Sequence, residues 1–217
     1  MTIKLYHFPG ACTCVTMNAL EEIGLEYEAV AVNLRQPPAE RGSYLAINPT
    51  GKVPTLEIGG TALKENAAIL WTLNSAYPEA GILPSFDDPL AGHACLADLT
   101  WCSGTMHPMV RQVRMPQKWT KGEVDGIRED GIGKLLVEAG RIANRIGNGW
   151  WYPQGWSVVD TYIYWGLKTA AKSGFPLDQF PLLEAHAERV RARPSYQRVL
   201  ARERQAVEEL GLVDVVP

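Results

Sequence analysis

The stretch FPGACTC, residues 8–14, separates two different residue patterns near the beginning of the chain. Residues 2–7 read as a short strand, and residues 13–24 follow a helical pattern. Cys12 is therefore expected at or near the first turn of a helix. Unpaired N–H groups and the positive end of the helix dipole favour a thiolate at such a place. This segment predicts a site that binds or activates a sulfur atom.

The first 77 residues alternate between strand and helix patterns. After the first helix, the chain predicts a β-rich run at 27–32, a short helix at 42–47, strands at 53–58 and 62–63, and a helix over 65–77. The order is βαβ, then a β-hairpin, then a helix. Such an order is typical of a small α/β domain.

Prolines and glycines punctuate residues 78–89, which we interpret as a linker. Beyond the linker no strand pattern is visible. Helices are predicted over residues 90–115, 122–146, 157–173, 182–193 and 194–210. Ser157 and Asp160 stand at the spacing of a capping box, with aspartate in place of the usual glutamate or glutamine. The second half is therefore predicted to be all-helical, and we interpret this cap as a folding device without chemistry.

Composition and charge disfavour several classes of function. The chain has 217 residues, is 46% hydrophobic and carries a net charge of −3, with acidic and basic residues interspersed. No basic stripe is available to neutralise phosphates, so we expect no nucleic-acid partner. No apolar run approaches about 18 residues, so we expect no membrane span.

The four cysteines of the chain are too few for a disulfide framework at this length, and they fit a reducing cytoplasm. Cys12 and Cys14 lie two residues apart, and side chains at that spacing on a helix point to opposite sides. No second Cys/His pair stands at metal-ligand spacing. We therefore expect no metal, and we interpret Cys14, Cys95 and Cys102 as small core residues.

Several short motifs follow one another along nearly the whole chain. They are Pro9-Gly10-Ala11-Cys12, Asn48-Pro49-Thr50-Gly51-Lys52-Val53-Pro54, Glu65-Asn66-Ala67-Ala68-Ile69, Ser157-Val-Val-Asp160 and the Arg193-Pro194 start of the last helix. Each is weak alone, but their order and spacing resemble the cytosolic glutathione S-transferases, most of all the bacterial beta class. The resemblance implies a thioredoxin-like α/β N-terminal domain over 1–78, a linker over 79–89 and an all-helical substrate-binding domain over 90–217.

The resemblance implies that glutathione is bound as a co-substrate by Lys52, Val53, Pro54, Glu65 and Asn66. In the family the proline is cis and exposes the backbone of the preceding residue, with which an extended peptide pairs as an added strand does. The γ-glutamyl carboxylate would meet the N–H and side chain of Asn66 at a helix start, and its ammonium would meet Glu65. Lys52 matches a position that often faces the glycine carboxylate. Without the resemblance, Pro54 reads as an ordinary strand-opening proline and Lys52 as a solvated charge.

Three residues compete for the activation of glutathione. Cys12 is the choice of the beta class, and as a thiolate it can attack glutathione disulfide and form a mixed disulfide. Thr13 resembles the serine or threonine of other classes, and Tyr6 the tyrosine of still others. Either hydroxyl would donate a hydrogen bond to the glutathione thiolate, worth about 1.5–3 kcal/mol. We favour Cys12, with Thr13 as the runner-up.

His107 matches a histidine that lies near the active cysteine in beta-class enzymes, where it could hold or protonate a sulfur. In that class a lysine usually follows, whereas Pro108 follows here and is expected to kink the helix. A purely structural His107 is an equally open reading. The residues expected to line the pocket for the electrophile are Phe8, Met106, Arg111 and Met115.

The resemblance implies a glutathione transferase, which directs the glutathione thiolate at an electrophilic, mostly hydrophobic substrate in detoxification. Thiol–disulfide exchange, ether cleavage and dehalogenation use the same nucleophile with another leaving group. The alternative is a protein that binds glutathione or hydrophobic ligands without turnover. A thioredoxin-type redox protein is disfavoured because Cys-x-x-Cys is missing. The family also implies a cytoplasmic homodimer.

Overall fold

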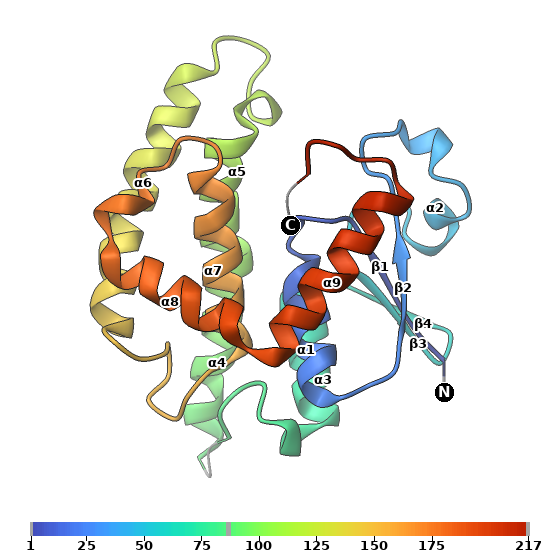
Figure 1. The fold of residues 1–217 in the computed structure, drawn as a ribbon, viewed down its shortest axis with the longest axis horizontal. Coiled ribbons are helices and arrows are strands. Elements are labelled where there is room, and N and C mark those ends of the chain that lie inside the picture. The colour runs from blue at the N-terminus through green and yellow to red at the C-terminus, as the bar shows by residue number, and fades with distance from the viewer. Residues whose placement is uncertain (1, 86–87, 216–217) are drawn as a thin grey trace. The chain divides into compact units, whose positions relative to one another are not determined.

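The computed structural model describes residues 2–85 and 88–215, so residues 86 and 87 of the predicted linker lie outside the described residues (Figure 1). The chain divides into two compact units. The first combines residues 1–80 with 193–217, and the second is residues 81–192. The last helix therefore belongs to the same unit as the N-terminal sheet, although it follows the other helices in the sequence.

The first unit is built on a four-stranded sheet with the order β2-β1-β3-β4. Strand β1 (Ile3–His7) pairs in parallel with β2 (Glu28–Ala31) and antiparallel with β3 (Thr55–Ile58). Strand β4 (Thr61–Lys64) pairs antiparallel with β3 and forms the hairpin. The predicted βαβ unit and hairpin are confirmed.

Helices α1 (Thr13–Ile23) and α3 (Asn66–Ala76) pack against each other, and α9 (Pro194–Glu209) packs along α1 (Figure 1). Helix α1 ends at Gly24, whose φ of 79° places it in the left-handed region that glycine tolerates. The short helix α2 (Tyr44–Ile47) precedes β3. Its Tyr44 forms a small buried cluster with Tyr6 and Val32. These elements match the predicted helix positions.

The second unit is helical, as the sequence predicts. Its main helices are α4 (Pro89–Trp101), α5 (His107–Arg114), α6 (Asp125–Ile146), α7 (Val158–Ala171) and α8 (Pro181–Ala192). Helix α7 is buried along most of its length, which explains its nearly continuous apolar sequence. No helix among the described residues has the length and apolarity to cross a membrane.

The predicted helix over 90–115 is interrupted by a π-helical turn, Cys102–Met106. In this turn the N–H of His107 donates to the carbonyl of Cys102, five residues earlier. Pro108 follows at once and has no N–H to continue the α-helical pattern. The expected irregularity at this proline is therefore a π turn, which is frequent at functional sites.

Helix α7 begins with the predicted capping box. The carboxylate of Asp160 accepts from the N–H of Ser157 at 2.8 Å and from its hydroxyl at 3.1 Å. The other carboxylate oxygen accepts from the N–H of Trp151 at 2.8 Å and lies 2.9 Å from Nε2 of His186. The cap thus ties two loops and two helices of the second unit together.

Candidate functional site

A tight turn carries the chain from β1 to Cys12. The N–H of Ala11 donates to the carbonyl of Phe8 at 3.1 Å, with Pro9 and Gly10 between them. Gly10 has a φ of 75°, as the third position of a type II turn requires. Cys12 then occupies the N-cap position of α1, as the sequence predicts. The thiol therefore stands at the positive end of a helix, where a thiolate is favoured.

Asn66 locks the start of α3 to the start of α1. Its Nδ2 donates to the carbonyl of Cys12 at 2.9 Å, and its Oδ1 accepts from the hydroxyl of Thr16 at 2.6 Å. Asn66 is 3% exposed, so its side-chain amide forms its hydrogen bonds inside the protein. A helix leaves the N–H groups of its first turn without intrahelical partners, and those of α3 are the part of the predicted carboxylate site that stays a prediction.

Glu65 immediately precedes α3 and is exposed. Its φ of 67° is the only positive φ among the non-glycine residues that the structure describes. A non-glycine residue in this region costs on the order of 1–3 kcal/mol, and such residues cluster at ligand sites. The backbone therefore places the Glu65 carboxylate beside the first turn of α3.

The segment before β3 is held by two side chains of the α2 region. The carbonyl of Lys52 accepts from Nδ2 of Asn48 at 2.8 Å and from the hydroxyl of Tyr44. The peptide bond between Val53 and Pro54 is cis, as the resemblance implies. Lys52 itself is exposed. The sequence motif contains Asn48, whereas nothing in the sequence singles out Tyr44.

Sheet register brings these parts to one end of the sheet. Tyr6 stands opposite Thr55, and Thr55 stands opposite Lys64. Pro54 and Glu65, which come directly before and after these residues, therefore lie at the end where β1 leaves for the Cys12 turn. The predicted glutathione-binding residues and Cys12 share this end of the first unit.

The surroundings of the three candidate activating groups differ. The hydroxyl of Tyr6 donates to Glu57 at 3.3 Å, and its ring packs 5.1 Å from that of Tyr44. Burial, and then the Glu57 carboxylate, raise the pKa of Tyr6. The hydroxyl of Thr13 is buried and has no hydrogen-bond partner among the described residues. Cys12, 8% exposed, is the candidate whose position at the helix start favours an ionised group.

Comparison with known proteins gives a consistent family. The sequence model described as "Glutathione S-transferase, N-terminal domain" matches residues 1–71. A maleylacetoacetate isomerase of Pseudomonas aeruginosa is 30% identical over 206 residues, covering 90% of this chain and 94% of that protein.

The chain belongs to the glutathione S-transferase family.

Solved structures agree with this assignment and with the thioredoxin-like fold predicted for the N-terminal part. The bacterial beta-class glutathione S-transferase of Sphingomonas chungbukensis is 27% identical, with a TM-score of 0.79 over 92% of this chain and 98% of that chain. A sphingomonad glutathione S-transferase in complex with glutathione is also 27% identical, with a TM-score of 0.80 and the same coverage.

Other predicted site residues lie in the second unit of this glutathione S-transferase. Nδ1 of His107 lies 3.2 Å from the hydroxyl of Tyr162, and its ring meets that of Trp165 at 4.6 Å. Met106 is fully buried and packs beside Gly166 of α7. These contacts make Met106 part of the helical core and give His107 a structural partner.

Three further residues belong to the predicted electrophile pocket. Arg111, in the last turn of α5, and Met115, just after α5, are half-buried. Phe8 is buried in the first unit, next to the Cys12 turn. Their part in substrate binding stays a prediction, as does that of His107. Among the described residues, no group of three or more His, Cys, Asp or Glu side chains is placed to hold a metal ion.

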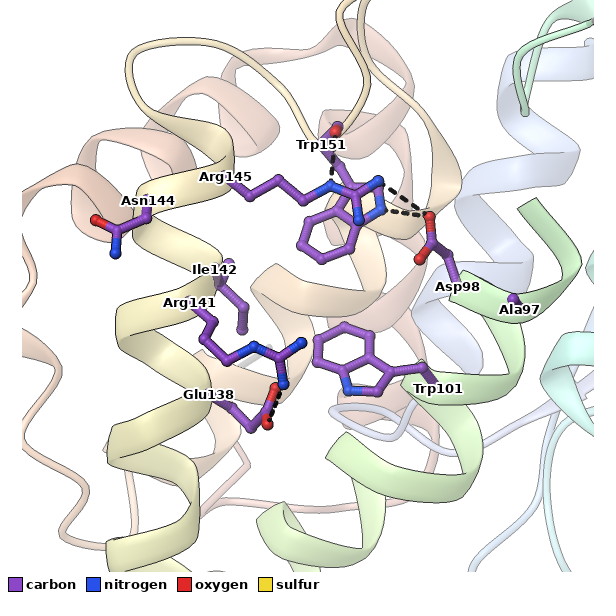
Figure 2. A pocket seen from close by; sticks show the side chains of 9 residues that line it. All are labelled: Ala97, Asp98, Trp101, Glu138, Arg141, Ile142, Asn144, Arg145 and Trp151. Carbon is purple, nitrogen blue, oxygen red and sulfur yellow. Dashed lines mark hydrogen bonds and ion pairs between the residues drawn. The ribbon is translucent and has the colours of Figure 1, made fainter. Parts of the chain in front are cut away.

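A cavity of about 660 Å³ lies in the second unit between α4, α6 and the segment before α7 (Figure 2). The residues that line it are Ala97, Asp98, Trp101, Glu138, Arg141, Ile142, Asn144, Arg145 and Trp151. Its charges are paired with one another: Arg145 meets Asp98 at 3.3 Å, and Arg141 meets Glu138 at 2.9 Å. None of the predicted site residues is among its lining residues.

Proposed function

We propose that this chain is a glutathione-dependent transferase that directs the glutathione thiolate at a small, mostly hydrophobic electrophile. One hydrogen bond supports this proposal most directly. Nδ2 of Asn66, the first residue of α3, donates to the carbonyl of Cys12 at 2.9 Å and so holds the starts of α1 and α3 together. The Cys12 thiol at the start of α1 and the first-turn N–H groups of α3 can bind a tripeptide thiol at two points, its sulfur and its carboxylate.

The anchors match the chemistry of glutathione. The first-turn N–H groups of α3 donate to the γ-glutamyl carboxylate, and the Glu65 carboxylate accepts from the ammonium. The backbone of Val53 pairs with the extended peptide as a neighbouring strand does. Lys52, exposed beside it, faces the glycine carboxylate. This arrangement leaves the sulfur of the central cysteine near Cys12.

Cys12 supports two related reactions. In transfer, the Cys12 thiolate takes the thiol proton of bound glutathione and donates it back as a hydrogen bond to the glutathione thiolate. The glutathione thiolate then forms a C–S bond while the leaving group departs with its electron pair. In exchange, the Cys12 thiolate attacks one sulfur of glutathione disulfide and releases a glutathione thiolate. The thiolate of a second substrate then attacks the glutathionyl sulfur, forms a new disulfide with it and releases Cys12 as a thiolate.

The test is a set of three single variants assayed with 1-chloro-2,4-dinitrobenzene and glutathione, and with glutathione disulfide and cysteamine as the accepting thiol. Cys12→Ala is expected to abolish exchange and to slow transfer by about 10- to 100-fold, the value of one hydrogen bond to a charged sulfur. Cys14→Ala, a buried neighbour on the same helix, and Thr13→Val are expected to keep both rates. Unchanged rates in Cys12→Ala would reject this assignment of the site, and loss of transfer in Thr13→Val would assign it to Thr13.

An isomerase is the second candidate, favoured by the name of the Pseudomonas aeruginosa relative. A glutathione thiolate that adds to a conjugated double bond and later leaves allows rotation about that bond. Glutathione is then regenerated, whereas transfer consumes it. Assays of an unsaturated diacid that follow both isomer ratio and free glutathione separate the two reactions.

The family resemblance also supports a homodimer, a cytoplasmic location, a role in detoxification and the domain boundaries 1–78 and 90–217 with a linker between them. Sedimentation of the purified chain measures the first of these. Saturable glutathione binding without turnover on a broad panel of electrophiles would favour the non-catalytic alternative.

A further inference from the structure

Helix α9 places a buried carboxylate on the turn that leads to Cys12. Glu203 of this helix is 2% exposed. Its Oε1 accepts from the N–H of Gly10 at 2.9 Å, across 193 residues of sequence. The family model ends at residue 71, so this contact comes from a part of the chain that the model does not cover.

The carboxylate is held in place by the packing of α9 along α1. Nε of Arg198 and Nε of Arg202 donate to the two oxygens of Glu21 at 2.7 Å and 2.6 Å. Nδ2 of Asn18 donates to the hydroxyl of Ser195 at 3.0 Å. These contacts fix the helix that carries Glu203, so the position of its carboxylate is fixed as well.

The two residues that follow Gly10 lead directly into α1. Gly10 adopts a φ of 75°, so the orientation of its N–H is set by the turn. On the far side, Nδ2 of Asn66 holds the carbonyl of Cys12. The segment around Cys12 is therefore held by a hydrogen bond from Gly10 to Glu203 of α9 and by one from Asn66 of α3 to the Cys12 carbonyl.

Stability alone does not explain a glutamate at this position. A buried carboxylate loses its hydration, and replacing such a group by an apolar side chain of similar volume is often neutral or stabilising. The hydrogen bond to Gly10 gives this carboxylate a specific geometric task. Placement of reacting groups is sensitive, since a misplacement of about 1 Å can lower a rate by about 100-fold.

We propose that Glu203 is a positioning residue of the Cys12 site, which it serves by holding the Pro9–Gly10 turn through the N–H of Gly10. The proposal rests on the proposed function for its effect on turnover. Its effect on the Cys12 thiol does not depend on glutathione. Glu203 touches neither substrate, and it acts through the backbone that carries Cys12.

The test compares two variants of equal charge in a Cys14→Ala background. Glu203→Gln keeps an oxygen that accepts from Gly10, and Glu203→Met keeps the length of the side chain without an acceptor. Because neither carries a charge, a difference between them reports the hydrogen bond alone. Glu208→Met, an exposed position on the same helix, is the control. Thermal unfolding of all three verifies that they are folded.

Three readouts are expected to separate the two variants. Hydrogen exchange of the Gly10 amide is faster in Glu203→Met. Alkylation of Cys12 by iodoacetamide, without glutathione, reaches half its maximal rate at a higher pH in Glu203→Met. The kcat of transfer is about tenfold lower in Glu203→Met, while KM for glutathione stays within about threefold, as expected for a misplaced reacting group.

Equal alkylation profiles and equal amide exchange in Glu203→Gln and Glu203→Met would overturn the proposal. A Glu208→Met control that reproduces the effects of Glu203→Met would overturn it as well. If the unsubstituted protein shows no glutathione turnover, the proposed function fails, and the alkylation and exchange comparisons still decide the role of Glu203.

Discussion

Two buried helix starts in this molecule are completed in opposite ways. At the start of α7, the carboxylate of Asp160 accepts four contacts, from Ser157, Trp151 and His186. Both oxygens of this carboxylate have hydrogen-bond partners inside the protein. This start is closed by the chain itself, which is what a structural cap requires.

The start of α1 is not closed in this way. Its N-cap residue is Cys12, whose carbonyl is held from outside by Asn66. The hydroxyl of the next residue, Thr13, is buried without a hydrogen-bond partner among the described residues. The two helix starts therefore differ: α7 has a capping box, whereas α1 begins at Cys12 without a side-chain cap.

The largest expected effect comes from removing the cap of α7. Asp160→Ala leaves several buried donors without an acceptor and removes the partner of His186. We expect the free energy of unfolding to fall by about 3–5 kcal/mol. Urea unfolding followed by tryptophan fluorescence measures it, with the exposed Asp178→Ala as control. A loss under about 1 kcal/mol would mean that this cap does not carry the fold of the second unit.

The two buried histidines, His186 and His7, also differ in their hydrogen-bond partners, and this difference affects how stability depends on pH. His186 lies against Asp160, whereas Nδ1 of His7 has no hydrogen-bond partner among the described residues. Burial, only partly offset by Glu209, lowers the pKa of His7 from 6.5 to about 4. Between these values the unfolded chain binds a proton that the folded chain refuses, so stability falls as the pH falls through this window.

For His7 the expected loss is about 3 kcal/mol by pH 4, with no contribution above pH 6.5. His7→Gln is therefore expected to flatten the acid side of the stability profile, measured by urea unfolding from pH 4.5 to 8. The exposed His93→Gln is the control and is expected to leave the profile unchanged. An equally steep acid side in His7→Gln would show that other groups cause it.

A smaller effect is expected where α3 begins. Glu65 holds a φ of 67°, which a glycine adopts at little cost. Glu65→Gly is expected to raise the free energy of unfolding by about 1 kcal/mol, the strain released less the extra entropy of the unfolded chain. Glu65→Ala keeps the strain and is expected to gain nothing. Both are expected to weaken glutathione binding about threefold through the lost charge, as calorimetry would measure. Equal stability of the two variants would contradict stored strain at this site.

The smallest effect is expected at the segment before β3. Tyr44→Phe removes one of the two hydrogen bonds to the carbonyl of Lys52 and leaves that from Asn48. We expect KM for glutathione to rise about fivefold with kcat unchanged, as for a loss of about 1 kcal/mol of binding. Tyr77→Phe is a matched control in the same unit. A fall in kcat without a change in KM would place Tyr44 nearer the reacting sulfur.

Local patterns predicted the parts of the molecule that local physics determines. The alternation of residues 2–7 and the helical spacing after Thr13 reflect burial on one face, which the sequence displays directly. The Ser157–Asp160 box is visible because both of its partners lie within one turn. The cis bond before Pro54 was implied by the resemblance, not by any local signal.

Long-range contacts explain what the sequence did not predict. Nothing in the pattern of residues 194–210 indicates that α9 packs in the same unit as the sheet. An amphipathic pattern shows which face of a helix is buried, but not which element covers that face. The bond between Glu203 and Gly10 spans 193 residues and leaves no local trace. The π turn before His107 depends on how the chain accommodates Pro108 in three dimensions. The commitment of the Asn66 amide to Cys12 is likewise a tertiary feature.

We propose that glutathione binds with its sulfur at the start of α1 and its γ-glutamyl carboxylate at the start of α3. Isothermal titration of the purified chain with glutathione tests it most directly. We expect saturable heat with one site per chain. Absence of heat, together with no rise in thermal unfolding temperature at millimolar glutathione, would contradict it.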